Sequence, residues 1–138
     1  MTILDTNVIS AMMNDPPDER VVAWLDRQVL SSIWTTSVTI LEIQTGLHVM
    51  PAGKKQAKLS QVFEKILDGI DHRVAGFDEE AARLAANLAS VRQRKGRIGE
   101  IRDTMIAAIV LAHRATLATR NVTHFSDIQA TVINPWVA

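Results

Sequence analysis

Residues 1–13 read MTILDTNVISAMM, and this segment sets how the fold begins. The apolar residues before Asp5 are typical of a short buried strand, which we expect over residues 1–5. A helix is expected directly afterwards, from Thr6 to Met13. Asp5 stands where the strand meets the helix, and it is the only charged side chain between Met1 and Asn14. Its carboxylate is therefore expected to be buried without a cation on its own element.

Short apolar segments and helical patterns alternate through the rest of the chain. Apolar residues at helical spacing predict helices, and four short aliphatic or β-branched runs predict strands. The expected helices span residues 18–29, 37–50, 54–67, 78–95 and 100–113, and the expected strands span residues 33–36, 72–77, 115–119 and 131–134. Strands separated by helices indicate a mostly parallel sheet covered on both faces. We therefore predict an α/β fold with a central sheet of about five strands, in one domain over residues 1–138.

The composition excludes several classes of protein. None of the 138 residues is cysteine, which excludes disulfides, thiol catalysis and cysteine-based zinc sites. The 15 Lys and Arg residues balance the 15 Asp and Glu residues, so any contact with nucleic acid must use a local basic patch. The chain shows neither a secretion signal nor the roughly 20-residue apolar run that a membrane span needs. We expect a protein of the cytoplasm without membrane contact.

Two further acids stand alone in uncharged surroundings. Glu42 is the only charged side chain in residues 33–53, and Asp103 opens a run that carries no charge up to Ala112. A buried carboxylate is costly unless a cation or a metal ion meets it. Both residues lie on expected helices, and the geometry permits them to reach the edge of the sheet where Asp5 lies.

The three acids are expected to meet at the carboxyl edge of the sheet. Asp5 ends the first strand and residues 119–121 end the fourth, and open α/β sheets build their sites at that edge. Carboxylate oxygens suit Mg²⁺ or Mn²⁺, which can activate a water and neutralise charge on a phosphodiester. We therefore predict that Asp5, Glu42 and Asp103 share one metal site. Each acid also has an ordinary interpretation, as a helix cap, as the partner of a distant arginine, or as a charge favoured by a helix dipole, respectively.

The segments that carry these acids form a recognisable series. They are residues 3–10 (ILDTNVIS), 37–43 (SVTILEI) with Gly46, 96–98 (GRI), 103–108 (DTMIAA), 117–121 (LATRN) with His124 and Phe125, and 132–136 (VINPW). With these segments in this order, the chain resembles the PIN-domain ribonucleases, specifically the toxin subunits of VapBC/FitAB-type toxin–antitoxin pairs. The resemblance implies a three-layer α/β/α fold. It also implies Mg²⁺- or Mn²⁺-dependent endoribonuclease activity, which is hydrolysis of phosphodiester bonds.

The resemblance further implies roles for single residues. In the family, acids that match Asp5, Glu42 and Asp103 form the metal site, with the two aspartates as principal ligands. The position of Asn121 completes the catalytic set, and in relatives it is often Asp and often Asn. Many relatives also carry Asp where this chain has His124, so the site here offers less negative charge. The resemblance therefore implies chemistry on a single metal ion and leaves open whether a second ion binds.

The partners implied by the resemblance are a cognate antitoxin, an RNA substrate and a second copy of the chain. The antitoxin of such a pair inserts a basic side chain into the acidic pocket, and this chain would meet DNA only through it. Single-stranded loops of structured RNA are the expected substrate, because their backbone can enter a cleft. The alternative is a catalytically silent PIN scaffold that binds its antitoxin and acts in DNA-bound autoregulation.

Several other side chains have two interpretations each. Asn7, Ser37 and Thr119 can hydrogen-bond the carboxylates as an outer layer, or act only as caps and turn residues. The basic residues between Arg92 and Arg102 can bind RNA phosphates or form a solvated helix end. His124 can carry a proton or be structural. The three tryptophans are expected in the core or in dimer contacts, and they are Trp24, Trp34 and Trp136.

Overall fold

The sheet of the molecule is parallel throughout. The computed structural model describes residues 1–97 and 99–138, so Ile98 of the 96–98 segment lies outside the described residues. Within those residues five strands pair in parallel, in the order β3-β2-β1-β4-β5. The strands are β1 (Thr2–Leu4), β2 (Ile33–Thr36), β3 (Val74–Ala75), β4 (Thr116–Ala118) and β5 (Val132–Ile133). The prediction of a mostly parallel sheet of about five strands is confirmed.

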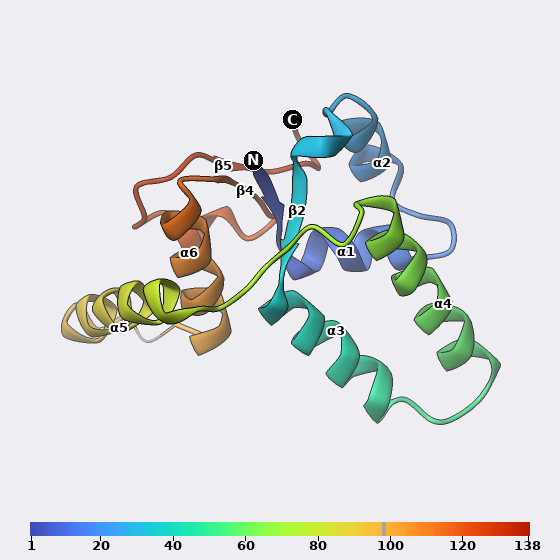
Figure 1. Ribbon diagram of the computed structural model, residues 1–138, viewed down its shortest axis with the longest axis horizontal. Coiled ribbons are helices and arrows are strands. Elements are labelled where there is room, and N and C mark those ends of the chain that lie inside the picture. The colour runs from blue at the N-terminus through green and yellow to red at the C-terminus, as the bar shows by residue number, and fades with distance from the viewer. Residues whose placement is uncertain (98) are drawn as a thin grey trace.

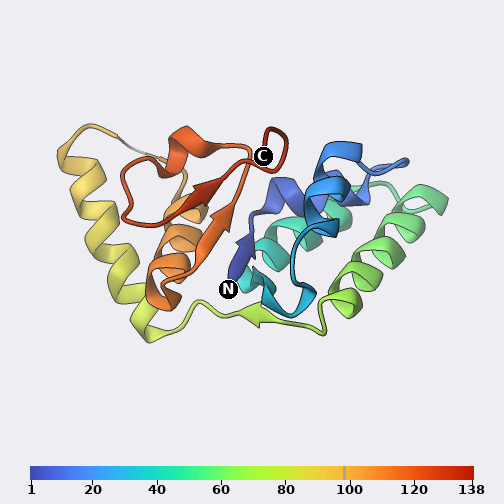
Figure 2. The same cartoon turned by 90° about the horizontal axis from the view of Figure 1, so that it is seen from above.

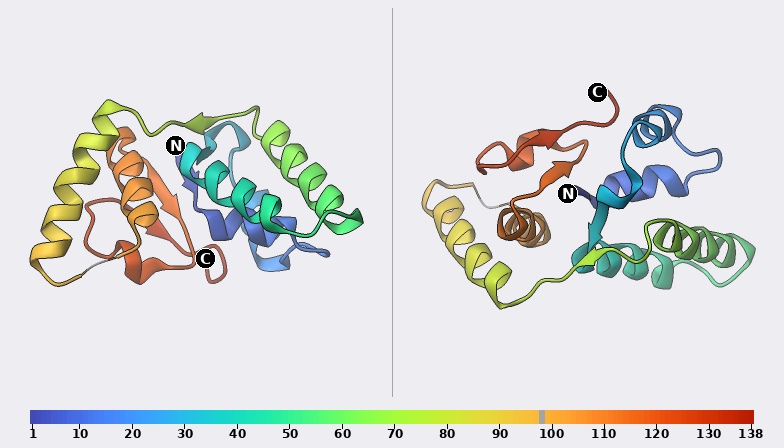
Figure 3. Two further views of the ribbon diagram at one scale, coloured as in Figure 1. Left: turned by 90° about the horizontal axis from the view of Figure 1, so that it is seen from below. Right: turned by 45° about the horizontal axis from the view of Figure 1, so that its top comes forward.

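Helices cover the sheet from both sides (Figure 1). They are α1 (Thr6–Met13), α2 (Glu19–Asp26), α3 (Ser37–Val49), α4 (Lys54–Gly69), α5 (Glu79–Arg94) and α6 (Ile101–His113), with short 3₁₀ turns η1 (Leu30–Ser32) and η2 (Val122–Phe125). Figure 2 shows α5 and α6 on one side of the sheet and α1 to α4 on the other, and Figure 3 shows the same division from two further directions. The expected three-layer α/β/α arrangement is confirmed. None of the helices in the described ranges is long and apolar enough to cross a membrane.

Each layer of helices encloses its own apolar core. On the side of α1 to α4, the fully buried Val8 and Phe63 pack in the same cluster as Leu4. On the side of α5 and α6, the fully buried Ile109 packs in the same cluster as Ile3. Ile3 and Leu4 are consecutive in β1 and therefore face opposite cores, as the alternation of side chains along a strand requires. The middle strand is thus anchored from both faces.

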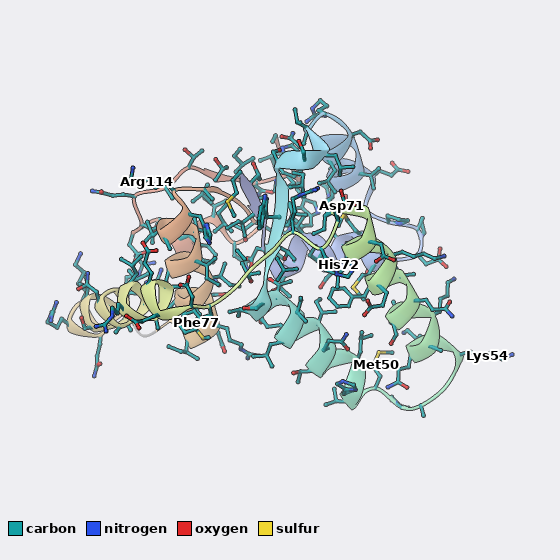
Figure 4. All side chains as sticks on the ribbon, in the orientation of Figure 1. Met50, Lys54, Asp71, His72, Phe77 and Arg114 are labelled. Carbon is teal, nitrogen blue, oxygen red and sulfur yellow. The ribbon has the colours of Figure 1, made fainter. Side chains whose placement is uncertain are left out.

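The third strand is shorter than the predicted segment of residues 72–77. Only Val74 and Ala75 form β3, because Asp71 and His72 both have positive φ angles, of 51° and 52°. Such left-handed backbone turns the chain and cannot continue a strand. Figure 4 shows these two residues in the turn that follows α4. The strand therefore begins only after this turn is complete.

Strand pairing decides where the first lone acid lies. β1 sits between β2 and β4, and the register places Leu4 beside Ala118. The backbone N–H of Asp5 donates to the carbonyl oxygen of Ala118 at 2.9 Å. Asp5 and Thr119 consequently lie side by side at the carboxyl edge. β2 and β3, which precede β4 in the chain, lie on one side of β1, and β4 and β5 lie on the other. Open α/β sheets form a crevice at the point where the strand order reverses in this way.

Replacing Ile109 by alanine is expected to lower the free energy of unfolding by about 2–5 kcal/mol. The side chain is fully buried, so its loss leaves a cavity in the core beneath α6. Leu41→Ala is the matched control, because Leu41 on α3 is 54% exposed and its loss should change stability by about 0.5 kcal/mol or less. Urea denaturation followed by circular dichroism measures both. Equal losses in the two variants would contradict the assignment of this core.

Candidate functional site

A cavity of about 420 Å³ opens beside the carboxyl ends of β1 and β4. Its lining includes the three lone acids Asp5, Glu42 and Asp103, together with Asn121, which the resemblance placed in the catalytic set. Asp5 comes from the β1–α1 junction, Glu42 from α3, Asp103 from the first turn of α6 and Asn121 from the segment after β4. The fold therefore brings the three lone acids and Asn121 together from four separate parts of the chain.

Asp5 is almost completely buried, with 3% of its surface exposed. Its Oδ1 accepts a hydrogen bond of 2.8 Å from the backbone N–H of Thr6, and its Oδ2 accepts one of 2.7 Å from the Thr119 hydroxyl. Burial raises the pKa of Asp5, and the bonds from the two threonines oppose that rise. Negative charges on Asp103 and Glu42 raise the pKa further. Among the described residues, no Lys or Arg nitrogen lies within 4.0 Å of the Asp5 carboxylate.

Asp5 therefore combines two of its proposed interpretations. It stands at the N-cap of α1 and accepts from that helix, as an ordinary capping residue does. Capping alone needs only one carboxylate oxygen and tolerates an exposed side chain. The second oxygen, which is buried and bonded to Thr119, is not explained by capping. A carboxylate kept this dry without a cationic partner points to a bound positive ligand.

Thr119 organises the end of β4 around Asp5. Its fully buried hydroxyl donates to Asp5 and accepts bonds from Asn7 Nδ2 at 3.2 Å and from the backbone N–H of Asn121 at 3.0 Å. Asn7 Nδ2 also lies 3.3 Å from Asp5 Oδ2, and Asn7 Oδ1 accepts from the backbone N–H of Arg120 at 3.1 Å. Asn7 and Thr119 thus form hydrogen bonds to a site carboxylate, as one of their two interpretations expected.

Ser37 does not join this arrangement. Its hydroxyl accepts a bond of 3.1 Å from the backbone N–H of Phe77 and so holds the segment before α5 against the start of α3. The interpretation of Ser37 as a partner of the site carboxylates is not supported, because within the described residues its hydroxyl forms no hydrogen bond to any of them. The position of Ser37 on the same helix as Glu42 did not predict which segment its hydroxyl would contact.

Glu42 is oriented by a chain of hydroxyl groups. Thr6 Oγ1 donates to Glu42 Oε1 at 2.7 Å. Thr36 Oγ1 donates to Thr39 Oγ1 at 3.3 Å, so the Thr39 proton is left to bond Thr6 Oγ1 at 3.1 Å. Thr36 and Thr39 are fully buried, where successive hydrogen bonds polarise one another. The three hydroxyls therefore hold the Glu42 carboxylate in one orientation at the cavity wall.

Sequence reasoning missed these three threonines. Thr36 precedes a predicted helix and accepts from the Thr39 backbone N–H at 3.0 Å, which is a normal N-cap and was open to prediction. The step from Thr39 to Thr6 is different. It depends on the packing of α1 against α3, which no local pattern in the chain reveals.

Glu42 has one arginine at the limit of ion pairing. Arg102 Nε lies 3.9 Å from Glu42 Oε2, whereas Arg102 Nη2 lies 2.8 Å from Glu100 Oε1. A long pair with a partly exposed arginine contributes little. The interpretation of Glu42 as the partner of a distant arginine is therefore only weakly supported. The carboxylate remains available to a ligand in the cavity.

A buried ion pair fixes the surroundings of Asp103. Arg92 donates to Asp127 at 2.8 and 2.9 Å, to Thr104 Oγ1 on α6 at 2.9 Å and to the carbonyl oxygen of His124 at 3.0 Å. The guanidinium holds the pKa of Asp127 below its usual value. By tying η2 to α6 it also brings His124 Nδ1 to 3.0 Å from Asp103 Oδ2. Arg92 is buried, so its interpretation as an RNA-phosphate ligand is wrong.

The donor set of the cavity suits a hard divalent cation. Asp5 and Asp103 supply carboxylate oxygens, while Glu42 is turned toward Thr6. The described residues contain no group of three or more His, Cys, Asp or Glu side chains arranged to hold a metal ion. Mg²⁺ keeps several waters and commonly takes only one or two protein carboxylates. Two aspartates therefore fit its requirement without a third protein ligand.

The chain matches one protein family over most of its length. The family model described as PIN domain matches residues 2–130. VapC ribonuclease Y4jK of Sinorhizobium fredii is 36% identical over 137 residues, which cover 99% of this chain and 98% of the relative. Toxin FitB of Neisseria gonorrhoeae is also 36% identical over 137 residues, which cover 99% of both chains.

The same likeness extends to the fold. A solved structure of FitAB bound to a DNA fragment matches with a TM-score of 0.88 at 36% sequence identity. The match covers 99% of this chain and 96% of that chain. Both the sheet and the elements around the cavity therefore fall within the shared part.

Asp5→Asn is expected to increase the free energy of unfolding at pH 7 in metal-free buffer. The folded pKa of Asp5 lies above the ordinary 3.8, so the fold favours the protonated acid and the ionised carboxylate lowers stability. That loss is complete above the folded pKa and vanishes below 3.8, so the advantage of the variant should disappear as the pH falls through this window. Urea titrations at several pH values measure it.

Glu64→Gln is the control for this comparison, because Glu64 is exposed on α4 and should change stability by about 0.5 kcal/mol or less at each pH. A lower stability of Asp5→Asn at pH 7 would show that the hydrogen bonds to the carboxylate outweigh its burial.

Proposed function

The chain belongs to the PIN domain family, and on that basis we propose that it is a metal-dependent endoribonuclease, the toxin of a type II toxin–antitoxin pair, built as a single domain over residues 1–138. The observation that carries the proposal is Asp5, which is buried without a cationic partner among the described residues and shares its cavity with two further lone acids, Glu42 and Asp103, and with Asp18. The names of its relatives, a VapC ribonuclease and a FitB toxin, support the same activity.

Asp5 and Asp103 are the proposed ligands of one Mg²⁺ or Mn²⁺ ion, with Glu42 completing its surroundings. When bound, such an ion lowers the pKa of a water and neutralises charge on a phosphodiester. Asn121 lines the same cavity and offers an amide N–H to a phosphate oxygen. The replacement of an acid by Asn121 at this position reduces the negative charge, which favours one ion over two.

The proposed reaction is hydrolysis of one phosphodiester bond. The oxygen of a water molecule bonds to phosphorus, the bond from phosphorus to the departing ribose oxygen breaks, and that oxygen takes a proton from solvent. Glu42 accepts the proton that the attacking water loses. Thr6 occupies Oε1 of Glu42, so Oε2 is the oxygen available for this proton. The hydroxyl chain behind Thr6 keeps that oxygen in place while the charge changes.

RNA with single-stranded loops is the proposed substrate, since a splayed strand can reach carboxylates in a recessed cavity. A cognate antitoxin is the proposed partner, and its basic side chain would neutralise the acids that the cavity gathers. In the FitAB structure the match is to a complex bound to DNA, and we propose that this chain meets DNA only through its antitoxin. A homodimer in the cytoplasm is the proposed working form.

A catalytically silent PIN scaffold is the alternative function. Asn121 in place of an acid favours it, as does the lack of a preformed three-ligand group among the described residues. The two functions differ in one simple property, because a scaffold needs no divalent ion in the cavity. Binding of Mn²⁺ to the folded protein therefore separates them.

Purified protein is expected to cleave a labelled RNA hairpin with Mn²⁺ and not with EDTA, and Asp5→Asn or Asp103→Asn is expected to reduce the rate by roughly 100-fold or more, since each removes a metal ligand. Single-turnover gel assays measure the rate. Mn²⁺ should also raise the melting temperature of the wild type and not that of Asp5→Asn.

Glu64→Gln serves again as the control and should cleave like the wild type. Unfolding cannot explain a loss in Asp5→Asn, because that variant is expected to be the more stable protein without metal. Equal cleavage by Asp5→Asn and wild type would refute the proposed site. A wild type that neither cleaves RNA nor is stabilised by Mn²⁺ would support the scaffold.

A further inference from the structure

Arg120 places a positive charge in the wall of the acidic cavity. Within the described residues it is the only Lys or Arg that lines this cavity. Its guanidinium carbon lies 5.0 Å from the centre of the Trp136 ring. No carboxylate of a described residue lies within 4.0 Å of the guanidinium, and no described residue accepts a hydrogen bond from it. Its donors therefore remain open to a ligand from outside.

Trp136 is a fixed support for this arginine. The residue is buried, its Nε1 donates to Asp18 Oδ2 at 3.0 Å, and its backbone N–H donates to Asn134 Oδ1 at 2.9 Å. The backbone of Arg120 is held as well, by its N–H bond to Asn7. A guanidinium over an indole face is attracted by the ring and keeps its N–H edge free. Arg120 is thus oriented before any ligand arrives.

The other arginines near the acids are already engaged. Arg102 binds Glu100 at 2.8 Å, and Arg92 forms the buried pair with Asp127. Arg97 donates to the carbonyl oxygen of Thr123 at 3.2 Å and lies 3.9 Å from the same Asp127. Each of these guanidinium groups has an acidic partner, and Arg120 has none among the described residues. A structural role as an ion-pair partner therefore does not account for Arg120.

An anionic polymer needs a cation of this kind at the cavity. The four carboxylates that line the cavity, one of them the Asp18 that binds Trp136, repel phosphate, and the formal net charge of zero gives the chain no general attraction for nucleic acid. A planar guanidinium matches two phosphate oxygens at once. Building on the proposed function, we propose that Arg120, oriented by Trp136, binds a phosphate of the RNA strand beside the bond that is cut. Such a contact positions the strand without reading its sequence.

The test replaces Arg120 by glutamine and measures hairpin cleavage with Mn²⁺ over a range of RNA and KCl concentrations. KM is expected to rise about tenfold while kcat stays within about twofold, because one charged hydrogen-bonded contact is lost in binding. The slope of log kcat/KM against log salt concentration should become shallower by about 0.7, the value for one phosphate contact on a single strand. Arg120→Lys keeps the charge and should retain the slope with an intermediate KM.

Arg83→Gln is the matched control. It removes the same charge from the exposed face of α5, where Glu79, at 3.1 Å, is the one ion-pair partner of Arg83 among the described residues, and it should leave KM and the salt slope unchanged. Trp136→Phe tests the support. It should raise KM when Arg120 is present and have no effect on KM in the Arg120→Gln background, because the ring acts through the arginine. A purely structural role of Trp136 would raise KM equally in both backgrounds.

Binding of a fluorescent single-stranded RNA to the wild type, Arg120→Gln and Arg83→Gln in EDTA gives a readout that does not depend on cleavage. A Kd about tenfold weaker in Arg120→Gln alone supports the contact. Equal Kd, KM and salt slope in wild type and Arg120→Gln would overturn it, even if the wild type cleaves RNA. A wild type that binds RNA through Arg120 and never cleaves it would instead overturn the proposed activity.

Discussion

A carboxylate buried at the end of the middle strand is the constraint around which this molecule is arranged. Only 3% of the surface of Asp5 is exposed, so its oxygens require partners from the protein or a bound cation. Thr119 supplies one partner from the neighbouring strand end, which is possible only because β1 and β4 pair in a single register. A shift by one residue would turn Thr119 to the other face of the sheet. The geometry of the site therefore depends on the register in which β1 and β4 pair.

The surroundings of the three acids differ in a way that suits their proposed roles. Asp5 is dry and bonded by neutral donors, whereas Asp103 is paired with His124 at the more open side. Glu42 is held from behind by hydroxyl groups. Each acid is therefore positioned by a different device. All three residues nevertheless line one cavity, as the proposed metal-assisted reaction needs.

Much of this site followed from the sequence, because the cost of burying a charge can be read from the residues around it. Lone acids in apolar segments selected Asp5, Glu42 and Asp103, and the alternation of strands and helices supplied the fold that gathers them. Contacts between distant elements could not be predicted in this way. Arg92 lies in a basic run that is typical of a solvated helix end. In the fold it is buried and forms an ion pair with Asp127, which follows 35 residues later. The hydroxyl chain and the Arg120–Trp136 contact likewise join residues that are separated in the sequence and meet only in the folded chain.

The two strands that flank β1 in the sheet are synthesised at different times. During synthesis, β2 becomes available soon after β1, whereas Thr119 follows Asp5 by 114 residues. Until then one edge of β1 is bare and α6 has no complete sheet to pack against. A nascent chain therefore carries Asp5 and Glu42 for most of its elongation without a cavity between them. Fragments that end between residues 103 and 115 contain all three acids but lack β4 and the Thr119 hydroxyl that binds Asp5.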